Sequence, residues 1–222
     1  MGQLSKAQNT PASFRKIMTA PALTVGTVVL ILAAGQSSRM RGGDKLCELV
    51  DGVPLLRLQC ERALGLGLPV YVALPSADHP RLALIADLPV TPLFVPEASE
   101  GMSGSMRGAV GQMPVWSHLL MVLPDLVEIE TTDMAAVLAG LAQAPEALIW
   151  RGATEDLQPG HPILFDGSLR ENFATISGDQ GGNCIVRPYR DRMHLVPLPD
   201  QRARRDLDTP EEWAAFRAET GR

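Results

Sequence analysis

Continuous apolar runs alternate with amphipathic segments along most of this chain. The apolar runs predict strands covered on both faces: Val28–Ala33, Val70–Leu74, Leu93–Val95, Leu119–Leu123, Ala147–Trp150 and Pro162–Phe165. The segments between them have the spacing of helices: Leu55–Leu64, Arg81–Ala86, Ser103–Gln112, Met134–Ala142 and Leu169–Ile176. This alternation predicts an α/β fold with a doubly wound, mostly parallel sheet and helices on both of its faces.

Helix-ending and helix-starting residues agree with this pattern. Gly65 and Gly67 can end the first predicted helix. Thr209-Pro210-Glu211-Glu212 is a capping box with proline at the first helical position, and it predicts a last helix to about Arg217. We therefore expect one domain over residues 27–217. Residues 1–26 do not resemble a secretory signal and are expected to form a flexible or partner-packed extension.

Composition narrows the class of protein. The chain has 222 residues and a net charge of −5, which argues against a nucleic-acid groove and against binding to an anionic membrane. No apolar run approaches the ~18 residues that a membrane span requires. Cys47, Cys60 and Cys184 are widely spaced and form no zinc or disulfide pattern, so a reducing, cytoplasmic location is expected.

The most informative local feature follows the first predicted strand. The apolar run from Thr27 to Ala34 ends in Gly35 and two serines, after which come three cations, Arg39, Arg41 and Lys45. Glycine lets the backbone approach an anion, the amides of such a turn can point at it, and the cations can neutralise it. The spacing matches neither the dinucleotide fingerprint nor the P-loop. It predicts a phosphate-binding loop of another kind.

Two further features lie at the ends of predicted elements, where parallel sheets place their ligands. Residues 101–108, Gly-Met-Ser-Gly-Ser-Met-Arg-Gly, form a second small-residue loop that enters a helix. It is either an anion- or base-binding helix start or a helix packed closely on the sheet. Asp125 directly follows a strand, and it is either a ligand for Mg²⁺ or a turn residue.

The C-terminal half adds two features. Gly160-His161-Pro162 leads into a strand and suggests a pocket for an acceptor, although a single histidine is more often only hydrogen-bonded within the fold. Asp208, just outside the last helix, is either a second carboxylate for the same metal or a charge favoured by the helix dipole. Together the features suit phosphoryl or nucleotidyl transfer, which needs positioning and charge neutralisation more than a covalent nucleophile.

The motif Leu32-Ala33-Ala34-Gly35-Gln36-Ser37-Ser38-Arg39-Met40, with Lys45, resembles the signature of the MobA-like nucleotidyltransferases. The resemblance is closest to the molybdenum cofactor cytidylyltransferase branch, because Ala-Ala-Gly replaces the Ala-Gly-Gly of the guanylyl branch. The rest of the family's order follows: Gly101 to Arg107, Leu123-Pro124-Asp125, Gly160-His161-Pro162, Gly178-Asp179-Gln180-Gly181 and Asp206-Leu207-Asp208-Thr209-Pro210.

This resemblance implies a Rossmann-like domain of the nucleotide-diphospho-sugar transferase type. It would transfer CMP or another NMP from an NTP with Mg²⁺ to molybdopterin or molybdenum cofactor, and release pyrophosphate. The resemblance further implies roles for individual residues. Arg39, Lys45 and Asp125 would be catalytic, and Asp125 and Asp208 would bind the metal. The nucleotide would be bound by Leu32, Ala33, Ala34, Gly35, Ser37, Ser38, Arg39, Lys45, Ser103, Ser105 and Arg107, and the acceptor by His161 and Asp179.

Other functions remain open on the sequence alone. Within the same class, the protein could use GTP or transfer to a sugar or alditol phosphate. In a different class, it could be a carrier that delivers the cofactor to a client molybdoenzyme without catalysis. A nicotinamide dehydrogenase is disfavoured because the second and third fingerprint glycines are missing after Gly35.

Overall fold

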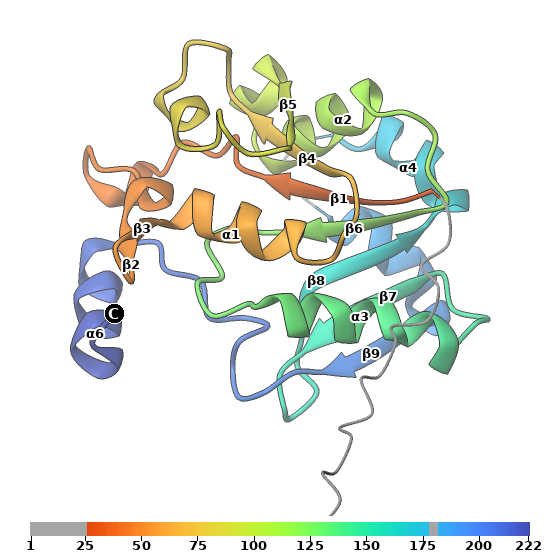
Figure 1. Cartoon of the computed structure of the whole chain (residues 1–222). Coiled ribbons are helices and arrows are strands. Elements are labelled where there is room, and N and C mark those ends of the chain that lie inside the picture. The colour runs from red at the N-terminus through yellow and green to blue at the C-terminus, as the bar shows by residue number, and fades with distance from the viewer. Residues whose placement is uncertain (1–25, 178–181) are drawn as a thin grey trace, which may run out of the picture.

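The computed structural model of the chain describes residues 26–177 and 182–222. A seven-stranded sheet forms its centre, in the order β5-β4-β1-β6-β8-β7-β9 (Figure 1). Its strands are β1 (Thr27–Leu32), β4 (Val70–Leu74), β5 (Thr91–Phe94), β6 (His118–Val122), β7 (Ile149–Ala153), β8 (Pro159–Asp166) and β9 (Met193–Pro197). A small antiparallel hairpin, β2 (Leu49–Val50) and β3 (Val53–Pro54), lies outside the sheet.

Most strand pairs are parallel, as the sequence predicts. β1 pairs in parallel with both β4 and β6, and β4 with β5. β8 is antiparallel to both of its neighbours, β6 and β7, while β7 and β9 run in parallel. The parallel strands end at one edge of the sheet, so the loops that follow β1, β5 and β6 lie close together there (Figure 1).

Helices cover both faces of the sheet (Figure 1). They are α1 (Leu55–Leu64), α2 (Met102–Gln112), α3 (Thr131–Gln143), α4 (Arg170–Thr175), α5 (Asn183–Val186) and α6 (Pro210–Thr220). One core cluster contains residues of α1, α3 and α6, and a second contains residues of α2, α4 and α5. The two cores confirm the doubly wound architecture.

The strand β1 shows why the apolar runs predict this arrangement. Val29 and Ile31 point into the core beneath α1 and α3, whereas Val28, Leu30 and Leu32 point into the opposite core. All six residues of the strand are buried. Because side chains alternate between the two faces, a strand covered on both sides needs apolar residues at every position.

The element boundaries agree with the sequence in most places. The helix over Leu55–Leu64 and the strand over Val70–Leu74 have the predicted bounds, and the Thr209 capping box is present with Glu212. The helix predicted over Arg81–Ala86 is wrong: this segment is a short 3₁₀ helix, η3 (Pro80–Leu84), that begins at a proline. Strand β9 was not predicted, because its first three residues are only partly buried and lack a continuous apolar pattern.

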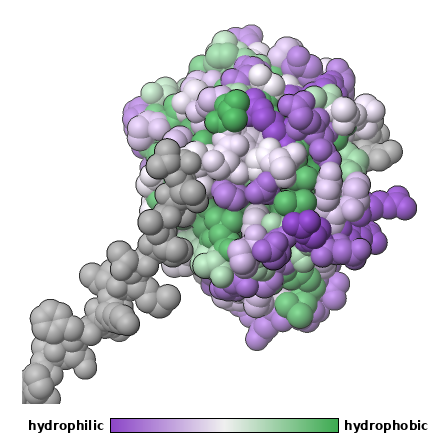
Figure 2. Space-filling view, turned by 90° about the vertical axis from the view of Figure 1, so that its right-hand side faces the viewer, coloured by the Kyte–Doolittle hydropathy of each residue, from purple (hydrophilic) through white to green (hydrophobic). Residues whose placement is uncertain are grey.

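Within residues 26–177 and 182–222, none of the helices combines the length and apolar character needed to cross a bilayer. Figure 2 views the end of the molecule where β1 begins, on the side opposite the loops that follow its carboxyl end. Hydrophobic residues form separate patches there, between hydrophilic ones.

Candidate active site

A cavity of about 420 Å³ lies at the carboxyl edge of the sheet, between the loop after β1, the turn after β6 and the start of α2. Its lining includes two cations, Arg39 and Lys45, and two carboxylates, Asp125 and Asp206. The other lining residues are Leu32, Ala34, Gly35, Gln36, Leu46, Ala98, Ser99, Gly101, Met102, Ser105, Leu123 and Pro124. The segments that the sequence singled out after β1, before α2 and after β6 therefore share one cavity.

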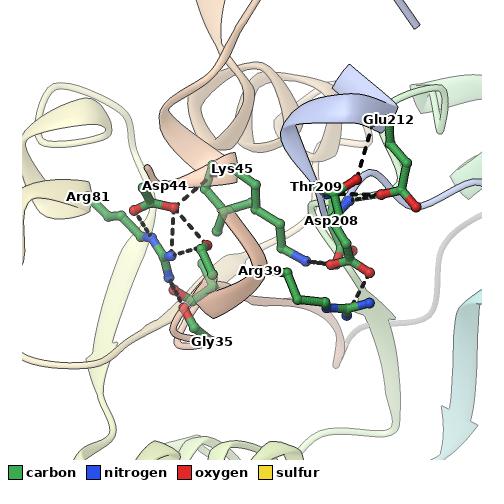
Figure 3. Close-up of polar contacts among 12 residues, drawn as sticks. Gly35, Arg39, Asp44, Lys45, Arg81, Asp208, Thr209 and Glu212 are labelled. Carbon is green, nitrogen blue, oxygen red and sulfur yellow. Dashed lines mark hydrogen bonds and ion pairs between the residues drawn. The ribbon is translucent and has the colours of Figure 1, made fainter. Parts of the chain in front are cut away.

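Lys45 links two carboxylates that are distant in sequence. Its Nζ lies 2.5 Å from Asp125 Oδ2 and 2.6 Å from Asp208 Oδ1. Arg39 Nη2 lies 2.6 Å from the other oxygen of Asp208 (Figure 3). The three side chains around Lys45 thus form one ion-pair network, in which Lys45 and the two carboxylates are largely buried while Arg39 is exposed.

The network sets the charge states of its members. Burial alone would lower the pKa of Lys45, but the nearby carboxylate of Asp125 and the contact with Asp208 outweigh it and raise that pKa. Burial opposes ionisation of Asp208, yet hydrogen bonding to Lys45 keeps its pKa below the usual value. The site therefore holds an ammonium group between carboxylates at neutral pH.

A third carboxylate completes an acidic cluster. One oxygen each of Asp125, Asp206 and Asp208 lies within 4.8 Å of the others. Burial and the neighbouring Asp208 raise the pKa of Asp206. Asp125 Oδ1 is buried and has no hydrogen-bond partner among the described residues. Carboxylate oxygens are the ligands that Mg²⁺ prefers, so this donor set fits a divalent cation.

The last helix fixes Asp208 in place. Glu212 accepts hydrogen bonds from the backbone amides of Asp208 (2.7 Å) and Thr209 (2.9 Å), and Thr209 Oγ1 accepts one from the Glu212 amide (Figure 3). The capping box of α6 therefore does more than start a helix. It holds the backbone from which Asp208 reaches Lys45 and Arg39.

The loop after β1 is built around a buried arginine. Arg81, from η3, is only 1% exposed, and it donates to the carbonyl oxygens of Ala33 (2.6 Å) and Gly35 (2.7 Å). It also contacts both oxygens of Asp44 at 2.7 Å and Ser37 Oγ at 3.0 Å (Figure 3). These contacts fix the segment from β1 to Lys45.

The wall formed by α2 depends on close packing. Gly101, with φ at +98°, is the N-cap of α2, and Ser105 Oγ donates to its carbonyl oxygen. A Cβ at Gly104 would lie 1.9 Å from the carbonyl oxygen of Glu97, in the 3₁₀ helix η4 (Pro96–Glu100). The small residues of this segment therefore serve packing, and Ser105 also lines the cavity.

A second cavity of about 270 Å³ adjoins the first, because Met102 and Leu123 line both. Its polar lining residues are Arg151, His161 and Asn183. Burial, and to a smaller extent the charge of Arg151, lowers the pKa of His161 to about 3, so its imidazole is neutral. The other lining residues are Met106, Met121, Ile163, Phe165, Gly182 and Val186.

The structure brings some sequence-predicted site residues together and separates others. The first cavity or its ion-pair network contains Leu32, Ala34, Gly35, Arg39, Lys45, Ser105, Asp125 and Asp208. Ala33 is buried, Ser37 bonds Asp44, and Ser38 is exposed. Ser103 is buried outside the cavity lining, and Arg107 instead contacts Glu100 and the Ile176 carbonyl. His161 lies in the second cavity, and Asp179 lies outside the described residues.

The model of the MobA-like NTP transferase domain matches residues 29–194. The chain belongs to this family. A curated relative from Trichormus variabilis, named "Probable molybdenum cofactor guanylyltransferase", is 34% identical over 122 residues. That match covers 54% of this chain, and the chain spans about half the length of the relative, 56%.

Solved structures support the MobA-like fold. The crystal structure of Rv0371c from Mycobacterium tuberculosis has a TM-score of 0.71 at 20% identity, covering 86% of this chain and 97% of that one. A CMP:2-keto-3-deoxy-manno-octonic acid synthetase complexed with CTP has a TM-score of 0.67 at 14% identity, covering 88% and 98%. At these identities the likeness shows the fold, which is the nucleotide-diphospho-sugar transferase type that the motif implied.

Sequence reasoning missed three polar residues of this MobA-like site. Asp206 lies in the same Asp206-Leu207-Asp208 motif as Asp208, so searching the sequence for a third carboxylate to complete the metal site would have found it. Arg151 directly follows the predicted strand Ala147–Trp150 and belongs to no motif that would mark it as a site residue. Arg81 was read as part of an amphipathic helix, and its partners are 37 to 48 positions away along the chain.

Proposed function

We propose that this protein is a nucleotidyltransferase that moves a nucleoside monophosphate from an NTP to a phosphate acceptor of the molybdenum cofactor type, with release of pyrophosphate. The observation that carries the proposal is the convergence of Lys45, Asp125 and Asp208, from three distant segments, beside the loop that follows β1. Family membership supports NTP as the substrate class.

The residues of the first cavity suit capture of a triphosphate. Gly35 has no side chain, and no protein atom lies within 4 Å of the position that a Cβ would take. A phosphate can therefore approach the backbone closely at this point. Arg39 and Lys45 would neutralise the charge that develops on the α-phosphate and on the leaving pyrophosphate. An acceptor phosphate is already ionised, so direct attack on the α-phosphorus requires no protein nucleophile.

Asp125 and Asp208, joined by Asp206, would hold a divalent cation, for which Mg²⁺ is the proposed ion. When bound, such an ion supplies charge neutralisation for phosphate oxygens. The unpartnered, buried Asp125 Oδ1 and the grouping of the three carboxylate oxygens within 4.8 Å of one another support this use of the cluster. Lys45 would keep the carboxylates together before the substrate binds, since it contacts two of them.

The second cavity is the proposed site for the acceptor. It opens beside the first one through Met102 and Leu123, so a group held there can present its phosphate to the nucleotide. Arg151 offers a positive charge and the neutral His161 a hydrogen-bonding group in otherwise apolar surroundings. This mixture suits a flat heterocycle that carries anionic substituents.

Two observations favour different nucleotides. The Ala33-Ala34-Gly35 motif resembles the cytidylyl branch, which favours CTP. The curated relative named as a guanylyltransferase favours GTP. We therefore propose CMP transfer from CTP as the primary activity and GMP transfer from GTP as the alternative.

A pyrophosphate-release assay tests these proposals. The purified protein is incubated with Mg²⁺, with each of the four NTPs in turn, and with or without molybdenum cofactor as acceptor. We expect acceptor-dependent release with CTP or GTP, and none after removal of Mg²⁺ with a chelator. Binding of the cofactor without any release would contradict catalysis and favour a carrier, and release with a sugar or alditol phosphate alone would replace the acceptor class.

A further inference from the structure

Arg81 occupies a position that the proposed chemistry does not use directly. It is one of the largest fully buried side chains of the described residues, and its guanidinium donates hydrogen bonds to residues of the segment from Ala33 to Asp44. It comes from η3, which follows β4 and lies outside the loops that line the cavity. Burying a guanidinium costs folding free energy unless its charge is paired and its N–H groups are hydrogen-bonded, so the position of Arg81 requires an explanation.

The first set of contacts controls the direction of two backbone carbonyls. Arg81 Nη1 donates to the oxygens of Ala33 and Gly35 at 2.6 and 2.7 Å. A carbonyl oxygen turned toward the anion would repel it, whereas these two are turned to the guanidinium. The arginine thereby keeps two negative dipole ends of the loop away from the proposed triphosphate.

The second set of contacts leads to Lys45. Arg81 Nε and Nη2 each lie 2.7 Å from an oxygen of Asp44, in a bidentate pair, while Asp44 Oδ1 accepts a hydrogen bond from the Leu46 amide. Asp44 is therefore the N-cap of the short 3₁₀ helix η2 (Lys45–Cys47), from which Lys45 reaches Asp125 and Asp208. The guanidinium holds Asp44 ionised, with its pKa below the usual value despite burial.

We propose that Arg81 is the positioning residue for triphosphate capture: one guanidinium fixes both the carbonyls of the Gly35 loop and the cap that aims Lys45. This inference rests on the proposed function, because it concerns the same cavity. Arg81 touches no proposed substrate atom and acts through the loop and through Asp44. Its loss should weaken nucleotide binding even where the fold is kept.

The test separates this role from simple stabilisation. Arg81→Met alone would leave the Asp44 carboxylate without its partner, so the main variant is the double substitution Asp44→Asn with Arg81→Met. Asparagine keeps a side-chain oxygen for the Leu46 amide and preserves the cap. The matched control is Arg57→Met, because Arg57 also forms a bidentate pair with a carboxylate, Asp87, and contacts the Leu84 carbonyl, but does not touch the loop.

Calorimetric titration with CTP and GTP, each with Mg²⁺, gives the affinities, and circular dichroism gives the fold. We expect the double variant to melt cooperatively yet to bind the preferred nucleotide about tenfold more weakly or worse, since small displacements of a site cost this much. Arg57→Met should bind within twofold of the wild type. Arg81→Lys keeps the positive charge but loses the planar guanidinium that makes the bidentate pair, so it should give an intermediate affinity. This variant replaces the double variant in the test if the double variant does not fold.

The outcomes are distinguishable. If the wild type binds nucleotide and the folded variants at position 81 bind it within twofold, the positioning role is overturned and the proposed function stands. If the wild type binds neither nucleotide, the proposed function is contradicted and the inference falls with it. If Arg57→Met weakens binding as much as the loss of Arg81, the effect is one of general stability, and the inference is likewise overturned.

Discussion

The two cavities at the carboxyl edge of the sheet are built on opposite principles. In the first, cations and carboxylates contact one another in a network around Lys45, so charge fixes the geometry before any substrate is present. In the second, Arg151 and a neutral His161 lie among apolar side chains. The lining of the first cavity suits the proposed triphosphate, whose negative charge needs cations, and the lining of the second suits the proposed acceptor, which would be recognised by its shape and a few polar contacts.

The largest expected effect concerns the centre of the charged cavity. Lys45→Ala should lower turnover by about 100-fold or more while the fold stays intact, because a cation aimed at developing charge is removed from a partly buried site. Pyrophosphate release under saturating nucleotide measures the effect, and Arg57→Met serves as a control for loss of a distant cation. Unchanged turnover would show that Lys45 has a structural role only.

The wall of the first cavity offers a test through packing. Gly104→Ala should destabilise the protein by roughly 1–3 kcal/mol and weaken nucleotide binding, because its Cβ would meet the Glu97 carbonyl at 1.9 Å. Gly111→Ala is a matched control in the same helix: nothing lies within 4 Å, and the change should stabilise by about 0.5–1 kcal/mol. Urea unfolding distinguishes them, and equal effects would show that α2 does not depend on this close approach.

The acidic cluster should distinguish its members by metal affinity. Asp125→Asn and Asp208→Asn should each weaken binding of Mn²⁺, used as a probe for Mg²⁺, by about tenfold or more, since a carboxylate ligand loses its charge. Electron paramagnetic resonance of free Mn²⁺ measures this directly. Asp166→Asn is the control, because Asp166 is the last residue of β8 and pairs with the first residue of β6, at the edge of the sheet opposite the cluster. Equal Mn²⁺ affinity in wild type and both cluster variants would remove these residues from a metal site.

The second cavity should respond through the acceptor alone. Arg151→Met should raise KM for the molybdenum cofactor by about fivefold and leave KM for the nucleotide unchanged, as one charge-assisted contact in a partly buried site contributes on this scale. Steady-state kinetics with each substrate varied in turn separates the two constants. A rise in the nucleotide KM alone would show that Arg151 serves the first cavity.

The smallest effect is a dependence of stability on pH. His161 has its pKa lowered to about 3 by burial and by Arg151, against about 6.5 in an unfolded chain. The unfolded state therefore binds the proton first, so stability is complete above pH 6.5 and decreases as the pH falls toward 3. His161→Gln should remove part of this decrease, on the order of 1 kcal/mol between pH 7 and pH 5. Urea unfolding at several pH values gives the free energy of unfolding of both proteins. If this free energy changes with pH to the same extent in both, His161 does not contribute.

The two cavities also differ in how far the sequence predicts them. The apolar runs and the Gly35 loop are local sequence patterns, so short stretches of sequence predict both the sheet and the phosphate-binding loop at its edge. Lys45 lies in the loop after the first predicted strand and Asp125 in the turn after a later one, and parallel strands bring such loops together, whereas Asp208 stands just before the last predicted helix. Roles for these residues remain predictions, but their proximity is what the pattern led us to expect.

The remaining features depend on tertiary contacts that carry no local signature. Arg81 looks like one polar position of a helix, and only the folded chain shows that it is buried against Asp44 and the Ala33 carbonyl. Arg151 lies on a strand whose neighbours are apolar, and its exposure to the second cavity depends on the packing of β8 and α5. Side-chain pairs of this kind are separated widely in sequence and cannot be read from periodicity.

The most direct test is a crystal structure with CTP or GTP and Mn²⁺, located by its anomalous scattering. We predict a manganese peak in contact with Asp125 and Asp208, with the phosphates against the loop at Gly35 and the base against the wall that includes Ser105. A nucleotide seated in the second cavity, or a metal remote from these two carboxylates, would contradict the assignment of the charged cavity to the triphosphate.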